Sequence, residues 1–182
     1  MKEWWDIKLR GIVGSDPEDC KEITILNRIL TWDGNELTLR SDPKHQEEIV
    51  KAFGLNAGSR GITIPVDKEA TAEEGDEELL EGEEVTKFRG LAARANYLGL
   101  DRCDVQYATK EICRHMARPT KGGMAKMKRL ARYLLEAPAG ILRYTSGGEE
   151  ALDRIKVYVD SDWAGCKSTR KSTSGGAIAW NG

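Results

Sequence analysis

Two acidic residues near the end of the chain are of the type that divalent metal chemistry uses. Asp160 and Asp162 follow the β-branched and aromatic run 157–159, and a second apolar run occupies 177–180. These runs predict two antiparallel strands joined by a turn, with the carboxylates at the end of the first strand. Nucleases that use two metal ions hold them with acidic side chains on rigid strands. Aspartate at a strand end is also a common turn former, so the residues alone leave both roles open.

Basic residues form a second group with potential chemistry. Apolar residues at helical spacing predict a helix over 123–136 whose other positions are rich in cations. The candidate phosphate contacts are Lys126, Lys128, Arg129 and Arg132 in this helix, with Arg170 and Lys171 in the predicted turn after Asp162. Such cations bind a nucleic-acid backbone without regard to its sequence. A solvated basic face is the alternative, and the sequence favours neither.

Strands and a helix are predicted in the first third of the chain. Apolar residues alternate on both sides of Asp33-Gly34, which predicts one β-hairpin within 8–39. Asp42 followed by Pro43 predicts a capped helix start, and Gly54 is placed to end that helix.

The middle of the chain changes composition twice. Residues 67–84 are mostly Asp and Glu with few apolar side chains, which predicts a mobile acidic linker. Three amphipathic segments follow within 85–138, separated by Pro119 and ended by Pro138. Their apolar stripes predict the core of a small helical bundle.

Composition limits the class of protein. The chain has 182 residues, 40% hydrophobic and 32% charged, with a formal net charge of −2. These values are typical of a globular protein, and no apolar run is long enough to cross a membrane. No apolar segment follows the first residues, so we expect an intracellular protein, cytoplasmic or nuclear, rather than a secreted one. The four widely spaced cysteines predict free thiols and no zinc site.

Several ordered motifs resemble one known family. They are Trp163-Ala164-Gly165 after the acidic residues, the run 170–175, Asn96-Tyr97-Leu98, Arg102-Cys103-Asp104-Val105, and Pro119-Thr120 followed by the basic run 128–134. In this order they resemble the Pol polyprotein of copia-type LTR retrotransposons, strongly over 87–182 and more weakly over 1–65. Two positions depart from the family pattern. Cys103 replaces a proline, and Gly123-Met124 replaces a His-Trp pair.

The resemblance implies a domain layout. Residues 1–66 would be the end of a reverse transcriptase palm and the start of its thumb, and 67–84 the acidic linker. Residues 85–138 would form the helical thumb and connection, and 139–182 the N-terminal part of a truncated RNase H-like domain. The predicted fold class is α+β: an N-terminal β-hairpin and helix, a small helical bundle, and a C-terminal RNase H-like β-hairpin.

The resemblance also implies an incomplete active site. Asp160 matches the first metal ligand of the RNase H site, and Asp162 is a nearby acid of less certain role. The complete enzyme would use Mg²⁺ or Mn²⁺, but we expect neither to bind this chain tightly, because the family's other acidic ligands lie further along. No Tyr-x-Asp-Asp polymerase motif is present. The expected partners are RNA–DNA hybrid or other nucleic acid and the rest of the Pol polyprotein, with no membrane.

Three hypotheses follow. The first is a fragment of a reverse transcriptase and RNase H polyprotein that is inactive alone. The second is a nucleic-acid-binding remnant or domesticated module that does not cleave. The third is an unrelated small α+β protein, which the ordered motifs disfavour.

Overall fold

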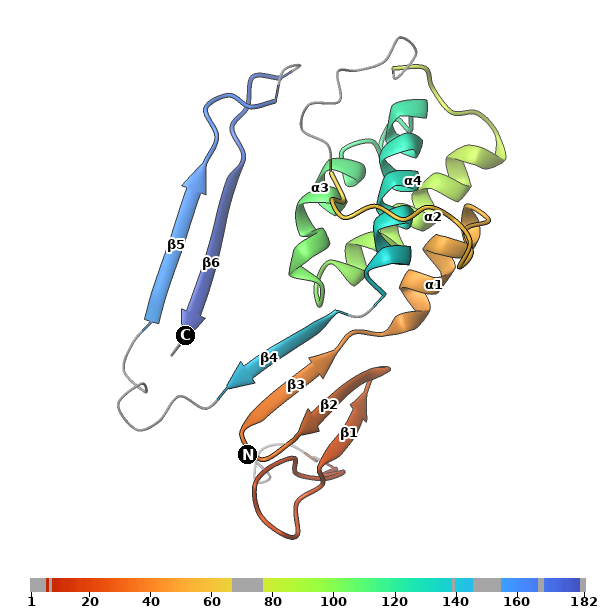
Figure 1. The fold of residues 1–182 in the computed structure, drawn as a ribbon. Helices are drawn as coiled ribbons and strands as arrows, with labels where there is room; N and C mark the ends of the chain where they lie inside the picture. Colours follow the sequence, from red (N-terminus) through yellow and green to blue (C-terminus); the bar gives the residue numbers. More distant parts are fainter. Residues whose placement is uncertain are drawn as a thin grey trace. The chain divides into compact units, whose positions relative to one another are not determined.

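The computed structural model describes Asp6 and residues 8–66, 77–138, 140–145, 155–166 and 169–180. The chain divides into two compact units, Met1–Arg143 and Tyr144–Gly182. Helices and strands are both present, as the α+β prediction requires (Figure 1). No helix in the described part of the chain is both long and apolar enough to span a bilayer.

A small antiparallel sheet begins the first unit. β1 (Glu22–Ile25), β2 (Arg28–Trp32) and β3 (Glu36–Arg40) pair in chain order, and β4 (Ile141–Thr145) lies beside β3. The predicted Asp33-Gly34 turn joins β2 to β3. The Asp33 carboxylate accepts from the backbone N–H of Glu36 at 3.1 Å, and Gly34 has a φ of 102°.

A second turn was not predicted from the sequence. Leu26 and Asn27, with φ values of 49° and 62°, join β1 to β2, so the expected single hairpin is a three-stranded meander. Asparagine tolerates the left-handed region, but leucine rarely adopts it. The residue types at this turn therefore do not predict it.

In the described part of the chain, four α-helices pack around one core. They are α1 (Pro43–Ala52), α2 (Glu83–Leu98), α3 (Gln106–Cys113), which follows the 3₁₀ turn η1 (Cys103–Val105), and α4 (Lys121–Glu136). The Asp42 carboxylate caps α1 by accepting from the Lys44 N–H at 2.9 Å, as predicted. Gly54, with a φ of 64°, follows the end of the same helix.

The predicted apolar stripes form this core. The buried hydrophobic side chains are Ile49, Leu80, Phe88, Leu91, Ala92, Ala95, Leu98, Val105, Ala108, Ile112, Met127, Leu130, Ala131 and Leu134. Met116 and Met124 pack against them at the edge. Burial of this surface is the main force that holds the helices together.

The acidic segment differs from the prediction at its C-terminal end. The Leu80 side chain is buried. The Leu80 backbone N–H donates to the Pro119 carbonyl at 2.9 Å, and the Lys121 backbone N–H donates to the Glu78 carbonyl at 2.8 Å. Helix α2 already begins at Glu83. Residues 77–84 therefore belong to the packed unit rather than to a linker, and residues 67–76 lie outside the described part of the chain.

Helix α4 begins two residues earlier than predicted because Thr120 caps it. The Thr120 hydroxyl accepts from the Gly123 N–H at 3.1 Å. Gly123 is buried, and a Cβ there would lie 2.9 Å from His115 and 3.3 Å from Phe88. A glycine at this position thus allows the α4 backbone to lie close to the side chains of His115 and Phe88.

Candidate functional site

Asp160 lies on a strand, as the sequence predicts. In the second unit, β5 (Ile155–Ser161) and β6 (Ser174–Trp180) form an antiparallel hairpin in which Asp160 is opposite Gly175. The Asp160 side chain is exposed. A metal ion or a polar ligand can therefore approach this acid from solvent.

Asp162 has a structural role in the loop that joins the strands. One of its carboxylate oxygens accepts from the backbone N–H groups of Thr173, at 2.7 Å, and Gly165, at 3.2 Å. Its own N–H donates to the Thr173 carbonyl at 3.0 Å. These bonds match the turn-forming role that the sequence left open, and they occupy the oxygen that a metal would otherwise share.

A complete metal site is not present in the described part of the chain, where no three His, Cys, Asp or Glu side chains gather. A two-metal site needs several carboxylates, because each ion takes many oxygen ligands. The described residues supply Asp160 and the partly engaged Asp162. They do not fit Mg²⁺ or Mn²⁺ as a site of their own.

Arg170 and Lys171 lie in the same loop as Asp162. The Arg170 N–H donates to the Cys166 carbonyl at 2.8 Å, and the Cys166 N–H donates to the Lys171 carbonyl at 3.2 Å. Both basic side chains are exposed. Two backbone hydrogen bonds thus join Cys166 to the basic pair, whose side chains face solvent.

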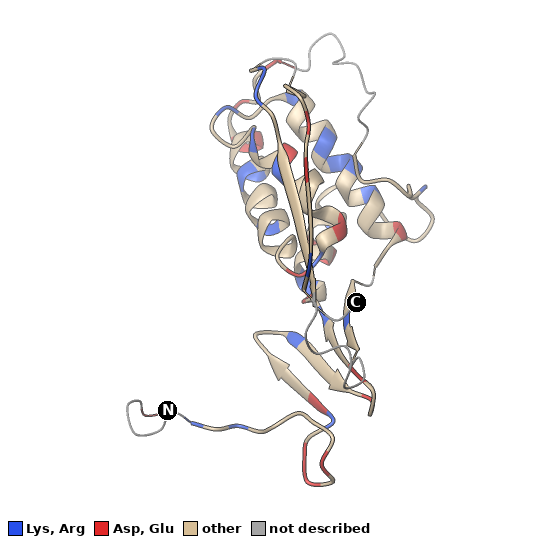
Figure 2. Cartoon of the chain, turned by 90° about the vertical axis from the view of Figure 1, so that its left-hand side faces the viewer, with Lys and Arg blue, Asp and Glu red and all other residues tan. Residues whose placement is uncertain are grey.

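The predicted basic face of α4 is only partly solvated. Lys128 is exposed, whereas Arg129 and Arg132 are half-buried. Arg132 donates from Nε to the Arg60 carbonyl at 3.0 Å, and the Lys126 ammonium lies 3.1 Å from His115 Nε2. The segment after α1 therefore contacts α4, and Figure 1 shows it crossing the helices. Figure 2 shows Lys and Arg recurring along the helical part of the chain, with Asp and Glu also present there.

His115 is held beside the start of α4. Its Nδ1 lies 3.1 Å from the Thr120 hydroxyl, and its pKa is lowered by burial and by the nearby charge of Lys126. A neutral imidazole leaves Nε2 free to accept from the Lys126 ammonium. This contact orients Lys126 but also uses one of its protons.

Arg102 is the most extensively bonded cation of the first unit. Its side chain is 1% exposed and donates to both carboxylate oxygens of Asp104, the shorter contact being 2.6 Å. It also donates to Gln46 Oε1 and to the Ala137 carbonyl, both at 3.2 Å. The Tyr133 hydroxyl adds a 2.8 Å bond to Asp104. One guanidinium thus connects α1, η1 and the end of α4.

The charges of this network stabilise one another. Burial disfavours the charged forms of both Arg102 and Asp104, but the hydrogen bonds and opposite charge of the pair outweigh it. The pKa of Asp104 is consequently lowered and that of Arg102 raised. The pair remains ionised at neutral pH, and its role is to hold the bundle together.

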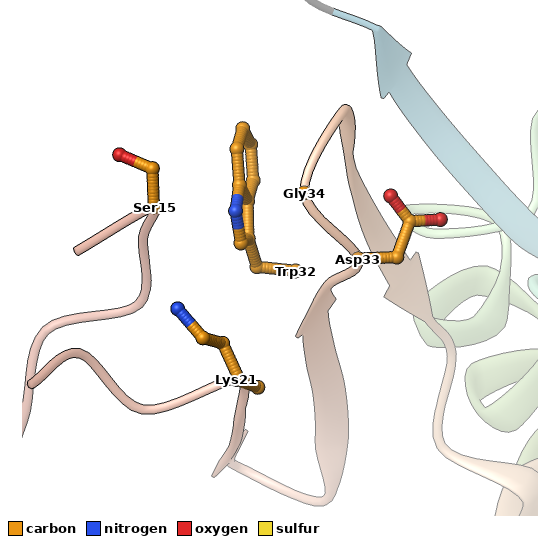
Figure 3. Close-up of a pocket in the computed structure, with 5 residues that line it drawn as sticks. All are labelled: Ser15, Lys21, Trp32, Asp33 and Gly34. Carbon is orange, nitrogen blue, oxygen red and sulfur yellow. The ribbon is translucent and has the colours of Figure 1, made fainter. Parts of the chain in front are cut away.

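One pocket in the described part of the chain is unrelated to these groups. A hollow of about 410 Å³ is lined by Ser15, Lys21, Trp32, Asp33 and Gly34 (Figure 3). The Lys21 ammonium donates to two backbone carbonyls, each at 2.9 Å. With its cation engaged in this way and only one carboxylate in the lining, the pocket has no pair of groups suited to acid–base chemistry.

Comparison with known proteins supports a relationship over half of the chain. The chain is 35% identical over 88 residues to the uncharacterized mitochondrial protein AtMg00810 of Arabidopsis thaliana. It is 33% identical over 90 residues to the retrovirus-related Pol polyprotein from transposon RE1 and 32% identical over 90 residues to that from transposon RE2, both of the same plant. About half of the chain is thus similar to retrotransposon Pol polyproteins. No protein-family model and no solved structure matches it.

The matched regions are a small part of the relatives. They cover 48% to 50% of this chain, but 35% of the mitochondrial protein and 6% of each polyprotein. The chain therefore spans much less than two thirds of the length of these relatives.

Two features of this Pol-related chain were missed from the sequence. Gln46 and Tyr133 complete the Arg102 network, but they lie 56 and 31 positions from Arg102 in the chain. Trp163 is part of a predicted motif, but the sequence does not predict that its side chain is 93% exposed. Asp162 before Trp163 and the small residues Ala164 and Gly165 after it are typical of a loop, and this was the signal that the sequence offered.

Proposed function

We propose that these 182 residues are part of a copia-type retrotransposon reverse transcriptase and RNase H polyprotein. In this assignment, 1–66 closes the palm and opens the thumb, 85–138 is the helical thumb and connection, and 139–182 opens the RNase H-like domain. The full polyprotein would perform RNA-templated DNA synthesis and handle RNA–DNA hybrids inside the cell. The relationship to Pol polyproteins supports this proposal.

Asp160 carries the proposal. It is an exposed acid on a paired strand, which is the type of position from which an RNase H-like site holds its metal ions. Mg²⁺ or Mn²⁺ would be held by the complete site, to which these residues would contribute only a part. In these residues Asp160 would be one ligand, and Asp162 would fix the loop beside it. We therefore propose that the chain alone does not cleave.

A cleavage assay tests this proposal. The purified chain is incubated with a labelled RNA–DNA hybrid in Mg²⁺ and separately in Mn²⁺, and we expect no products beyond those of a protein-free control. Metal-dependent cleavage that disappears in Asp160→Asn but persists in Asp16→Asn would contradict it. Asp16 is a suitable control because it is an exposed aspartate of the other unit.

Binding without cleavage is the second candidate function. The observation that favours it is the set of cations on α4, of which Lys128 is exposed and Lys126 lies at the protein surface beside His115. Cations on one helix contact phosphates whatever the base sequence, and each such contact adds to the salt dependence.

Fluorescence anisotropy with an RNA–DNA hybrid tests this binding. We expect weak affinity that falls steeply as salt rises. Changing Lys126, Lys128, Arg129 and Arg132 to Gln should weaken binding to all sequences and flatten the salt slope by up to about 3.6, or 0.9 per lost contact. A control variant removes the same charge through Lys8, Arg40, Lys44 and Lys51, all exposed and outside α4. Equal losses in the two variants would mean that only total charge matters.

A further inference from the structure

The loop between β5 and β6, residues 162–173, has an unusual aromatic residue. Trp163 is 93% exposed, more than any other large hydrophobic side chain in the described residues. Tryptophan is normally mostly buried, since its ring offers a large apolar area. A ring exposed to this extent presents its faces to solvent.

The backbone on both sides of Trp163 is hydrogen-bonded to the other end of the loop. Before it, Asp162 and Thr173 exchange two hydrogen bonds, at 2.7 Å and 3.0 Å. After it, the Ala164 N–H donates to the Ser172 hydroxyl at 3.1 Å. These hydrogen bonds join the backbone beside the exposed ring to the other end of the loop.

Two cations lie on the opposite side of the same loop. Lys171 directly precedes Ser172, the residue bonded to Ala164, and Arg170 precedes Lys171. Arg170 has a φ of 55° and Ala164 a φ of 48°, in the region that glycine occupies most easily. Non-glycine residues in such a conformation often mark functional positions, because the strain has to be offset by other contacts.

The charges of the loop favour an anionic ligand. Arg170 and Lys171 are exposed, and the one acid among the described loop residues, Asp162, is engaged with two backbone N–H groups. An exposed aromatic ring in the same site as phosphate-binding cations is the combination by which proteins bind single-stranded nucleic acid without sequence preference. A blunt duplex offers phosphates but stacks its bases inside, where the ring cannot reach them.

We infer that this loop binds single-stranded nucleic acid, with Trp163 stacking on one unpaired base and with Arg170 and Lys171 contacting the neighbouring phosphates. The inference rests on the proposed function, because it assigns an unpaired strand to a chain proposed to handle RNA–DNA hybrids. It adds a site distinct from α4, with a different ligand. The stacking contact and the phosphate contacts are separable, since one depends on bases and the other on salt.

Anisotropy measurements on the full 182-residue chain test the inference. The probes are a labelled oligo-deoxythymidine about twelve nucleotides long, an abasic strand of the same length, and a blunt RNA–DNA hybrid. We expect Trp163→Ala to weaken oligo-deoxythymidine binding about ten-fold and Trp163→Phe to retain most of the affinity. The abasic strand should bind the parent chain about as weakly as oligo-deoxythymidine binds Trp163→Ala. Hybrid affinity should not change.

Two further variants complete the design. Changing Arg170 and Lys171 to Gln should lower the salt slope for the single strand by about 1.4, whereas Trp163→Ala should leave the slope unchanged. Tyr144→Ala is the matched control, because Tyr144 is 54% exposed and lies outside the loop, and it should have no effect. The abasic comparison uses the unmodified chain, so it tests stacking even if a variant folds poorly.

Several results would overturn the inference. They are equal binding of the abasic and normal strands, unchanged affinity in Trp163→Ala, no single-strand binding by the parent, or self-association of the chain that Trp163→Ala abolishes. The last result would identify a second copy as the occupant of the ring. Hybrid binding that persists through α4 in any of these cases would leave the proposed function intact. Cleavage that depends on Asp160 would contradict the proposal that the metal site is incomplete, but it would not contradict the stacking contact of Trp163.

Discussion

Arg102 connects three parts of the first unit through one side chain. Replacing it with Met would leave the Gln46 oxygen and the Ala137 carbonyl without this donor and Asp104 without its cation. We expect Arg102→Met to lower the free energy of unfolding by about 2–4 kcal/mol, since unsatisfied groups and broken buried ion pairs cost this much. Chemical denaturation followed by circular dichroism measures the change.

The control is an arginine in an exposed ion pair. Arg143 lies 3.6 Å from Glu36, and its side chain is 66% exposed. Surface pairs of this kind contribute less than about 1 kcal/mol. Equal losses in Arg143→Met and Arg102→Met would show that the buried network adds nothing beyond a surface charge.

Asp104 makes the stability of the first unit depend on pH. Burial acts to raise its pKa, but the bonds from Arg102 and Tyr133 lower it overall. The folded chain therefore binds this proton less tightly than the unfolded chain. The stabilisation is complete above the ordinary carboxyl pKa of about 4 and is lost as pH falls through the lower folded value. Asp104→Asn should show a shallower loss of stability in acid than the parent, with Asp16→Asn unchanged. A variant as acid-sensitive as the parent would exclude Asp104 as the cause.

At the scale of single elements, the start of α4 depends on one hydroxyl. Thr120 is buried, caps the Gly123 N–H and contacts His115. Thr120→Ala should cost about 1 kcal/mol or somewhat more, because it leaves a buried N–H without a partner. Thr120→Ser keeps the hydroxyl and should retain most of the stability in thermal and chemical unfolding. A Ser variant as unstable as the Ala variant would assign the effect to the lost methyl group.

Local chemistry explains which elements could be predicted from the sequence. The cap at Asp42, the turn at Gly34 and the apolar stripes of the helices each depend on residues close together in the chain. The turn at Leu26 could not be predicted, because its residue type is unusual there. The hydrogen bond between Leu80 and Pro119 could not be predicted either, because residue types alone do not specify a contact between segments about 40 positions apart.

The same reasoning applies to the candidate site. The strand that carries Asp160 follows from the β-branched run before it, so its position could be predicted. The role of Asp162 was decided by its 2.7 Å bond to a residue 11 positions away. The exposure of Trp163 opposes the usual preference of tryptophan, and only the fold reveals it.

At the scale of the whole molecule, the net charge of −2 conceals a basic chain. Residues 67–84 contain ten acidic residues and one basic residue, which leaves 20 acidic and 27 basic residues elsewhere, a net charge of +7. Salt-dependent binding to phosphates is compatible with this distribution, although the total charge does not suggest it.

The stability of the molecule is concentrated in its first unit. Among the residues that the structure describes, the buried hydrophobic side chains all lie between Ile49 and Leu134. All of β5 is exposed, and so is Ile178 in β6. A two-stranded hairpin without a covered face is at best marginally stable. The unfolding transition of the chain should therefore report the helical core.

Removing the second unit tests this conclusion. A chain that ends at Thr145 keeps β4 and every residue of the core, so its thermal midpoint should lie within about 3 °C of that of the full chain, a difference below about 1 kcal/mol. A peptide of residues 155–180 should show no cooperative transition by circular dichroism. A midpoint that falls by much more than this would show that the hairpin contributes to the stability of the core. A folded peptide would show that the hairpin needs no partner, because the strand pairing itself would then suffice to hold Asp160 in place.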